Sequence, residues 1–465
     1  MDKEIAEANE KYDFIRFTFT DIHGIGRSKT VSKSSFDKFF KKGAQFYVGS
    51  LGFGFKGELD ACDKVNGEQK ATNFQSTGNL TALPVSGTLH PLSADKDKTF
   101  RVGEILCETF HSATGMRQEE NPRYIARKQV DRLQSLGYEI YSSFELEFML
   151  VDSETLKPVF SNIGEMFSSS NQSRFDPILL DITSQLEAVG IEVETLQSEY
   201  SDGQFEIVFK PQLGIKIADN LFLAKNCIKD IALTHNLKAI FMTKIGDIHS
   251  CNGLHYNHSL RKIGTDDDIY AFYDKTGSLG LSDICYRWLG GLIRHFRAMN
   301  SICSPTFNCY RRLDKLWAPC YSGWGIDNRM ESYRVKNFSP EETFIESRLP
   351  SGSSNPYLVL AVTIAAGIDG LENQLPCPPP SPLPLTVSSS DIYTKMEPSK
   401  VPLTLGEALT ALEEDTYIVK TLGKEFVKWF ILLKEAEINL LTGCDVKKKE
   451  VEILARERDL YMDLL

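Results

Sequence analysis

Two acidic residues interrupt an apolar segment whose alternating pattern is typical of a buried β-strand. The segment spans residues 138–151, and Glu145 and Glu147 are its central charged positions. Side chains along a strand alternate between two faces, so both carboxylates project from one face and their apolar neighbours from the other. Two carboxylates about 7 Å apart on an inward face repel each other, which favours a bound divalent cation. A solvated acidic face on an amphipathic strand explains the same pattern without a cation.

Three more strand-like segments each place polar side chains on one face of an otherwise apolar strand. They span residues 204–209, 254–260 and 344–349, and their polar positions are Gln204, Glu206, His255, Asn257, Ser259, Glu346 and Arg348. Glu199 precedes the first of them, ahead of a Ser-Asp-Gly turn. A lone polar residue on such a strand is ordinarily a surface or core residue. Four strands that each carry polar side chains on one face favour a single site to which all four contribute.

Composition indicates a soluble globular protein and excludes two classes of function. The chain has 465 residues, of which 42% are hydrophobic and 25% charged, so it is long enough for two domains. A net charge of −11 argues against nucleic-acid binding, and no apolar run is long enough to span a membrane. The charged N-terminus is not a secretion signal. Ten cysteines without paired metal-type spacing indicate reduced thiols. We expect a cytoplasmic protein.

The order of predicted elements divides the chain into two domains. A small sheet-rich domain is predicted over residues 12–107, with a polar loop at 57–83. A larger domain over 118–465 opens with a helix at 121–136 and alternates its strands with further helices at 177–189, 214–235, 283–298 and 355–371. A proline-rich connection at 375–386 cannot be a helix or a central strand. Helices close the chain at 405–414 and over 417–465, with a break at 442–443.

These segments occur in the order typical of the glutamine synthetase family. The matching motifs are Phe19-Thr20-Asp21-Ile22-His23-Gly24, Glu145-Leu146-Glu147, Gly203-Gln204-Phe205-Glu206, Gly253-Leu254-His255, Asn328-Arg329, Glu346-Ser347-Arg348 and Asn355-Pro356-Tyr357-Leu358. The resemblance runs from about residue 12 to residue 465. It implies an α+β fold, with an N-terminal β-grasp domain and a catalytic domain built on a curved antiparallel sheet with flanking helices. It also implies a ring-forming homo-oligomer, and we expect a dodecamer of stacked rings.

The resemblance assigns residues to two metal sites and to ATP. Glu147, Glu199 and Glu206 match one metal site, and Glu145, His255 and Glu346 match the other. These ligand types suit Mg²⁺ or Mn²⁺, with two ions in each site. The arginines expected near the phosphates, the nucleotide and the amino acid are Arg312, Arg329, Arg334 and Arg348, and Ser259 is expected near the nucleotide. Of these, Arg329 and Arg348 are the predicted catalytic residues.

The ammonium side of the site departs from the family pattern. Val48 takes the position of an aspartate that binds ammonium, and Trp317 aligns with a catalytic glutamate in a loop that is one residue shorter. Neither side chain can bind ammonium by charge or accept its proton. Ser250-Cys251 replaces an Asn-Gly pair that holds the amino acid, and Asp314 could be drawn into the shortened loop. Ordinary glutamine synthesis is therefore not expected.

Two hypotheses remain open. Segments 121–126, 355–370 and 396–426 resemble the vertebrate-lens branch of the family, which is regarded as lacking glutamine synthetase activity. That resemblance implies a structural, chaperone-like or cytoskeleton-associated role, with intermediate-filament proteins as partners. The alternative is an ATP-dependent γ-glutamyl ligase that joins glutamate to an organic amine, because an apolar pocket containing Trp317 suits such a substrate.

Overall fold

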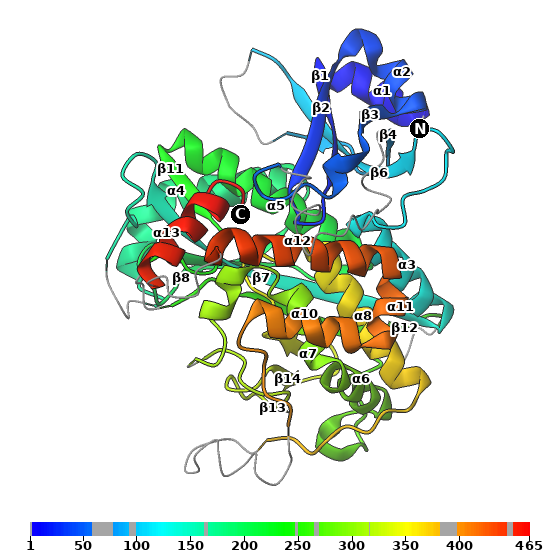
Figure 1. Ribbon diagram of the computed structural model, residues 1–465, viewed down its shortest axis with the longest axis vertical. Helices are drawn as coiled ribbons and strands as arrows, with labels where there is room; N and C mark the ends of the chain where they lie inside the picture. Colours follow the sequence, from blue (N-terminus) through cyan, green and yellow to red (C-terminus); the bar gives the residue numbers. More distant parts are fainter. Residues whose placement is uncertain are drawn as a thin grey trace.

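The computed structural model contains two β-sheets with helices packed around them (Figure 1). It describes residues 2–57, 78–92, 99–161, 166–246, 250–264, 269–315, 317–381, 398–443 and 450–465. The predicted α+β class is confirmed. Within these residues, no helix is both long and apolar enough to cross a membrane.

The smaller sheet is built from the N-terminal part of the chain. Its strand order is β2-β1-β6-β4-β3, and β5 also pairs with β6; the pair β1–β6 is parallel. The strands are β1 (Phe14–Thr20), β2 (Gly26–Ser32), β3 (Ala44–Tyr47), β4 (Asn79–Pro84), β5 (His90–Pro91) and β6 (Val102–His111). Helices α1 (Asp2–Lys11) and α2 (Phe36–Lys42) accompany them, and the short helix η2 (Val48–Leu51) follows β3. The predicted loop at 57–83 is wrong at its end, where β4 forms; residues 58–77 lie outside the described part.

The larger sheet unites all four strands that carry the polar faces. Its order is β13-β14-β15-β12-β7-β9-β8, with β10 and β11 also paired to β7. The strands are β7 (Tyr138–Asp152), β8 (Val193–Ser198), β9 (Gln204–Phe209), β10 (Gln212–Leu213), β11 (Leu237–Ile240), β12 (Leu254–Lys262), β13 (Trp324–Ile326), β14 (Tyr333–Asn337) and β15 (Thr343–Ser347). The predicted strands at 138–151, 204–209, 254–260 and 344–349 are therefore confirmed as β7, β9, β12 and β15, with small shifts at their ends.

The apolar face of this sheet forms the main core. Phe144, Leu146 and Phe148 of β7 are fully buried, and helices α3 (Pro122–Ser135) and α5 (Lys216–Thr234) contact the same strand. Helix α8 (Pro356–Glu372) packs against α3, α5 and α6 (Asp283–Arg294), and nearly all of its side chains are buried. Burial of apolar area is the dominant stabilising term in folding, so this packing fixes the opposite, acidic face of the sheet in place.

Most of the predicted helices form, with one corrected start and two breaks that were not predicted. The helices of the larger part are α3 (Pro122–Ser135), α4 (Ser169–Ala188), α5 (Lys216–Thr234), α6 (Asp283–Arg294), α7 (Phe296–Cys303), α8 (Pro356–Glu372), α10 (Leu405–Glu414), α11 (Thr416–Leu422), α12 (Lys424–Thr442) and α13 (Glu450–Tyr461). The start at 177 is wrong: Ser168 caps α4, and Pro177 lies inside the helix at the cost of one backbone donor. The predicted helix 283–298 is two helices that meet at His295. The helix predicted from 417 is also broken before 442–443, because Gly423, with a φ of 109°, separates α11 from α12.

The proline-rich connection follows α8 and forms neither helix nor strand in its described part. Residues 375–381 lack helix or strand, and two hydrogen bonds attach this stretch to β13 through Trp324. The rest of the predicted connection, to residue 386, lies outside the described residues.

Candidate active site

Strand register brings the predicted metal ligands onto one face of the larger sheet. Glu145 of β7 lies opposite His255 of β12, and Glu147 lies opposite Glu206 of β9. Directly opposed residues of antiparallel strands share a face and have Cβ atoms about 5 Å apart. On β15, Glu346 lies opposite Asn257 of β12, while Glu199 follows the end of β8. We refer to Glu145, Glu147, Glu199, Glu206, His255 and Glu346 as the acidic face.

Three members of the acidic face are close enough to share one cation. Ligand atoms of Glu145, Glu206 and His255 all lie within 4.8 Å of one another. His255 Nδ1 is 3.0 Å from Glu145 Oε2 and 3.8 Å from Glu346 Oε1. The group combines Glu206 from one predicted metal site with Glu145 and His255 from the other.

Glu147 is held by donors from two neighbouring segments. Its Oε2 accepts hydrogen bonds from the Gly253 backbone N–H at 2.8 Å and from Gln204 Nε2 at 3.0 Å. A Cβ at Gly253 would lie 3.3 Å from Glu147 Oε1 and 3.1 Å from Arg312 Nη2, which is tighter than ordinary contact. Glycine at this position therefore allows the close approach of a carboxylate and a guanidinium.

The electrostatics of the acidic face favour a positive ligand. Burial, together with repulsion from Glu145 and Glu147, raises the pKa of Glu206 well above its usual value. Burial and the charge of Glu147 raise the pKa of Glu199 to about 8. Burial alone would also raise the pKa of Glu145, but hydrogen bonds from His255 and Asn257 lower it to about 2. Carboxylate oxygens with one imidazole are a donor set that fits Mg²⁺ or Mn²⁺, so these residues fit the expected cations.

Three of the predicted arginines surround Glu346 and the end of β15. Arg334 Nη1 lies 2.9 Å from Glu346 Oε2, and Arg348 pairs with the other oxygen. Arg312 is buried and donates to the Arg348 carbonyl at 2.9 Å, and burial lowers its pKa. The fourth, Arg329, is exposed in a turn before β14. Ser259 lies farther along β12 on the face of His255, opposite Tyr141.

The residues that replace the ammonium-site acids lie in different places. Val48 is buried in η2 beside the smaller sheet, where its N–H donates to Gly78 O. Trp317 is 57% exposed with a φ of 66°, and its carbonyl accepts a hydrogen bond from Arg348 Nη2 at 3.0 Å. Asp314 pairs with Lys400 at 3.0 Å. The backbone of Trp317 is thus attached to the arginine cluster, while its side chain is exposed.

Sequence reasoning missed several side chains that support this site. Gln197 of β8 donates to Glu206, Asp327 binds Arg334, and Lys336 lies 3.7 Å from Glu346. Arg334 and Lys336 alternate along β14, so the same period-two pattern could have identified that strand. Gln197 and Asp327 carry no such signal.

Comparisons with known proteins agree with this geometry. The family model for the glutamine synthetase catalytic domain matches residues 119–453. Human lengsin is 31% identical over 467 residues, covering 98% of this chain and 84% of lengsin. A glutamate–isopropylamine ligase from Pseudomonas sp. is 30% identical, covering 78% of this chain and 79% of the ligase. A solved GmaS/ADP complex superposes with a TM-score of 0.80 at 25% identity and 98% coverage of both chains.

Proposed function

Because the chain belongs to the glutamine synthetase family, we propose that it is an ATP-dependent ligase that joins glutamate to an organic amine. The observation that carries this proposal is the acidic face, where Glu145, Glu206 and His255 offer ligand atoms within 4.8 Å of one another, close to three buried arginines. A buried cluster of carboxylates that share no cation is costly, as the raised pKa values of Glu199 and Glu206 indicate. A protein with a purely structural role gains nothing from that cost.

In this proposal the acidic face holds two divalent cations, as in the family pattern. Glu147, Glu199 and Glu206 would hold one ion, and Glu145, His255 and Glu346 the other. Bound Mg²⁺ or Mn²⁺ would neutralise the charge of the ATP phosphates. The GmaS structure that this chain resembles was solved with ADP, which supports a nucleotide as the second cofactor.

The arginines would supply the remaining positive charge. Phosphoryl transfer from ATP to the γ-carboxylate of glutamate gives γ-glutamyl phosphate, and attack by an amine displaces phosphate and leaves an amide. Catalysis of such transfers depends on positioning and charge neutralisation. Arg334 and Arg348 are oriented by Glu346, and Arg312 by backbone carbonyls, so these guanidinium groups are preorganised. We assign phosphate contacts to Arg329 and Arg334, and the substrate carboxylate and transferred phosphate to Arg312 and Arg348.

Trp317 supports an organic amine over ammonium. Its backbone carbonyl accepts a hydrogen bond from Arg348, and its exposed indole would offer an apolar and π surface to the substituent of an amine. The similarity to a glutamate–isopropylamine ligase supports the same substrate class. We further propose that residues 12–107 of a neighbouring subunit bring Val48 to the site, within a ring that assembles as a stacked dodecamer.

The test is ADP release by purified protein with ATP, Mg²⁺ and glutamate, in the presence of methylamine, isopropylamine, benzylamine, putrescine or ammonium. We expect release that depends on one or more of the organic amines and formation of the corresponding γ-glutamyl amide by mass spectrometry. Glu346→Gln should abolish it, whereas Glu341→Gln, an exposed change nearby, should not. Absence of turnover with every amine, while cation and ATP still bind, would contradict the ligase proposal.

The second candidate is a non-catalytic role like that implied by the lens branch. The similarity to lengsin over 98% of the chain favours it. In that case we propose a cytoplasmic structural or chaperone-like protein that associates with intermediate filaments. Co-sedimentation with assembled filaments, without amine-dependent turnover, would support this candidate over the ligase.

A further inference from the structure

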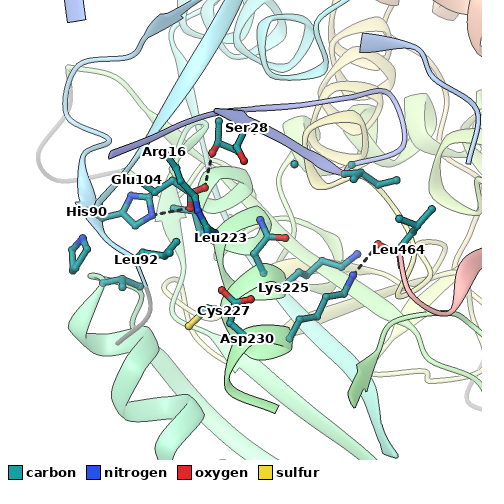
Figure 2. A pocket seen from close by; sticks show the side chains of 18 of the residues that line it. Arg16, Ser28, His90, Leu92, Glu104, Leu223, Lys225, Cys227, Asp230 and Leu464 are labelled. Atoms are coloured by element: carbon teal, nitrogen blue, oxygen red, sulfur yellow. Dashed lines mark hydrogen bonds and ion pairs between the residues drawn. The ribbon is translucent and has the colours of Figure 1, made fainter. Parts of the chain in front are cut away.

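A cavity of about 260 Å³ lies between the smaller sheet and helix α5 (Figure 2). One wall consists of β1, β2, β5 and β6 and includes Arg16, Ser28 and Glu104. The opposite wall is α5, with Lys225 and Lys229, and residues 463–465 close one side. No member of the acidic face lines this cavity, so it is separate from the candidate active site.

Two lysines of α5 face the cavity with unused hydrogen-bond donors. An ammonium group has three N–H donors. Lys225 Nζ donates to the Gly352 carbonyl at 2.8 Å, and Lys229 Nζ donates to the Leu464 carbonyl at 2.8 Å. Both groups also lie over the Phe241 ring, at 5.0 and 5.7 Å from its centroid. Among the described residues, neither lysine has a carboxylate within ion-pair distance.

The acids around the cavity are mostly engaged by other groups. Glu104 accepts a hydrogen bond from Thr18 at 2.6 Å and pairs with His90 at 3.4 Å. Asp463 pairs with Lys238 at 2.9 Å, and Asp230 is exposed at the edge. Arg16 contributes a third cation to the wall, and His90 a titratable ring. The cationic side chains and the side-chain carboxylates that line the cavity are therefore equal in number, but Glu104 and Asp463 pair with His90 and Lys238 and not with the two lysines.

The lysines are poorly stabilised in their charged form. Burial lowers the pKa of Lys225 to about 7, with a further contribution from the charge of Lys229. Burial also lowers the pKa of Lys229 to about 8, although Asp463 and Asp230 oppose the shift. A bound anion would supply the missing counter-charge, so anion binding and protonation of these lysines should favour each other.

We propose that this cavity binds a small anion bearing a phosphate, sulfate or carboxylate group, with Lys225 and Lys229 as its principal donors. The cavity volume exceeds the roughly 30 Å³ that one water occupies in the liquid, so it has room for such a ligand. Lys225 also holds the carbonyl of Gly352, whose N–H donates to the Asn252 carbonyl at 3.0 Å. Asn252 in turn accepts from Gln204, a donor to Glu147. The anion would therefore sit one hydrogen-bonded chain away from the acidic face.

Isothermal titration calorimetry with sulfate, inorganic phosphate and succinate tests the proposal. The comparison is between the wild type, Lys225→Met with Lys229→Met, and the control Lys210→Met, whose lysine is exposed and paired with Glu192. Loss of two charge-assisted hydrogen bonds should weaken binding at least about tenfold in the double variant alone. Preference for sulfate and phosphate over succinate would indicate a phosphate-type ligand, and the reverse a dicarboxylate. Equal affinities in all three proteins would overturn the proposal, because the arginines near Glu346 would then account for any binding.

Competitive acetylation of the wild-type protein provides a measurement that needs no variant. Amines with a lowered pKa react readily with acetic anhydride near neutral pH, and a bound anion should protect them. Mass spectrometry should show sulfate protecting Lys225 and Lys229 at least about threefold relative to Lys210, consistent with fractional occupancy of a weak site. Sulfate that leaves the acetylation of both lysines unchanged at a concentration that saturates the calorimetric signal would also refute the assignment.

Discussion

Replacing Glu199 by glutamine should stabilise the metal-free protein at neutral pH. The folded protein raises the pKa of Glu199 to about 8, whereas the ordinary value is 4.5. Between these values the folded state retains a proton that the unfolded chain has released. Stability contributed by this group is therefore greatest below pH 4.5 and falls as pH rises towards 8. Glutamine resembles the protonated side chain and should remove that loss.

The size of the effect follows from the same pKa values. Each pH unit above 4.5 costs about 1.4 kcal/mol until the folded pKa is reached. At pH 7 the full penalty would be about 3 kcal/mol, and partial exposure of Glu199 reduces the expectation to about 2 kcal/mol. Mutations that stabilise by this much are uncommon, and they mark sites where function is retained at the expense of stability.

Urea denaturation of chelator-treated protein at pH 5, 7 and 8 measures the effect. The difference between Glu199→Gln and the wild type should be small at pH 5 and grow to about 2 kcal/mol at pH 7. Glu194→Gln, an exposed change on β8, is the control and should show no such trend. Added Mn²⁺ should stabilise the wild type more than Glu199→Gln, since a ligand that binds only the folded state stabilises it. A variant no more stable than the wild type at pH 7 would refute the argument that the acidic face is strained without a cation.

Three further predictions follow from the packing and the site. Burial lowers the pKa of His295, but hydrogen bonds to Asp415 and Asp369 raise it overall. The stability that protonated His295 gives the folded protein should be complete below pH 6.5 and be lost as the pH rises through the raised pKa. His295→Gln should therefore cost more stability at pH 6 than at pH 9, as measured by urea denaturation. Gly367→Ala would place its Cβ 2.3 Å from two atoms of the Trp288 ring and should lower stability by about 3 kcal/mol. Gly406→Ala, whose Cβ would meet only Thr404 Oγ1 at 4.0 Å, should be neutral or stabilising, and thermal unfolding measures both. Trp317→Ala should raise KM for bulky amines several-fold with little change in the melting temperature, because the indole is 57% exposed; unchanged KM values would exclude Trp317 from amine recognition.

The acidic face was largely predictable because its information is local. Alternation along residues 138–151 determines which side chains share a face, and β7 forms with Glu145 and Glu147 opposite a buried apolar face as expected. The helix starts at Asn121 and Asn355 were also predictable from neighbouring residues, because each asparagine caps the first turn of its helix and is followed by a proline. The predicted start of α4 at residue 177 was wrong, because Ser168 supplies the cap and Pro177 lies inside the helix.

Other properties were decided by contacts between distant segments. Register between β7, β9 and β12 groups Glu206 with Glu145 and His255, and no spacing in the chain specifies that pairing. Asp314 pairs with Lys400, which lies 86 positions later in the chain, and no local pattern specifies that ion pair.

The amino-acid sequence by itself determined the kind of ligands this protein offers, because residue type and strand period are local properties. Tertiary structure alone decided which ligands meet, since strand order and register depend on long-range pairing. It also created the cavity, whose walls come from β1 and from α5, some 200 residues apart in the chain. Lys225 and Lys229 are ordinary helix residues in the sequence, and only the folded chain brings Phe241, Gly352 and Leu464 against their ammonium groups.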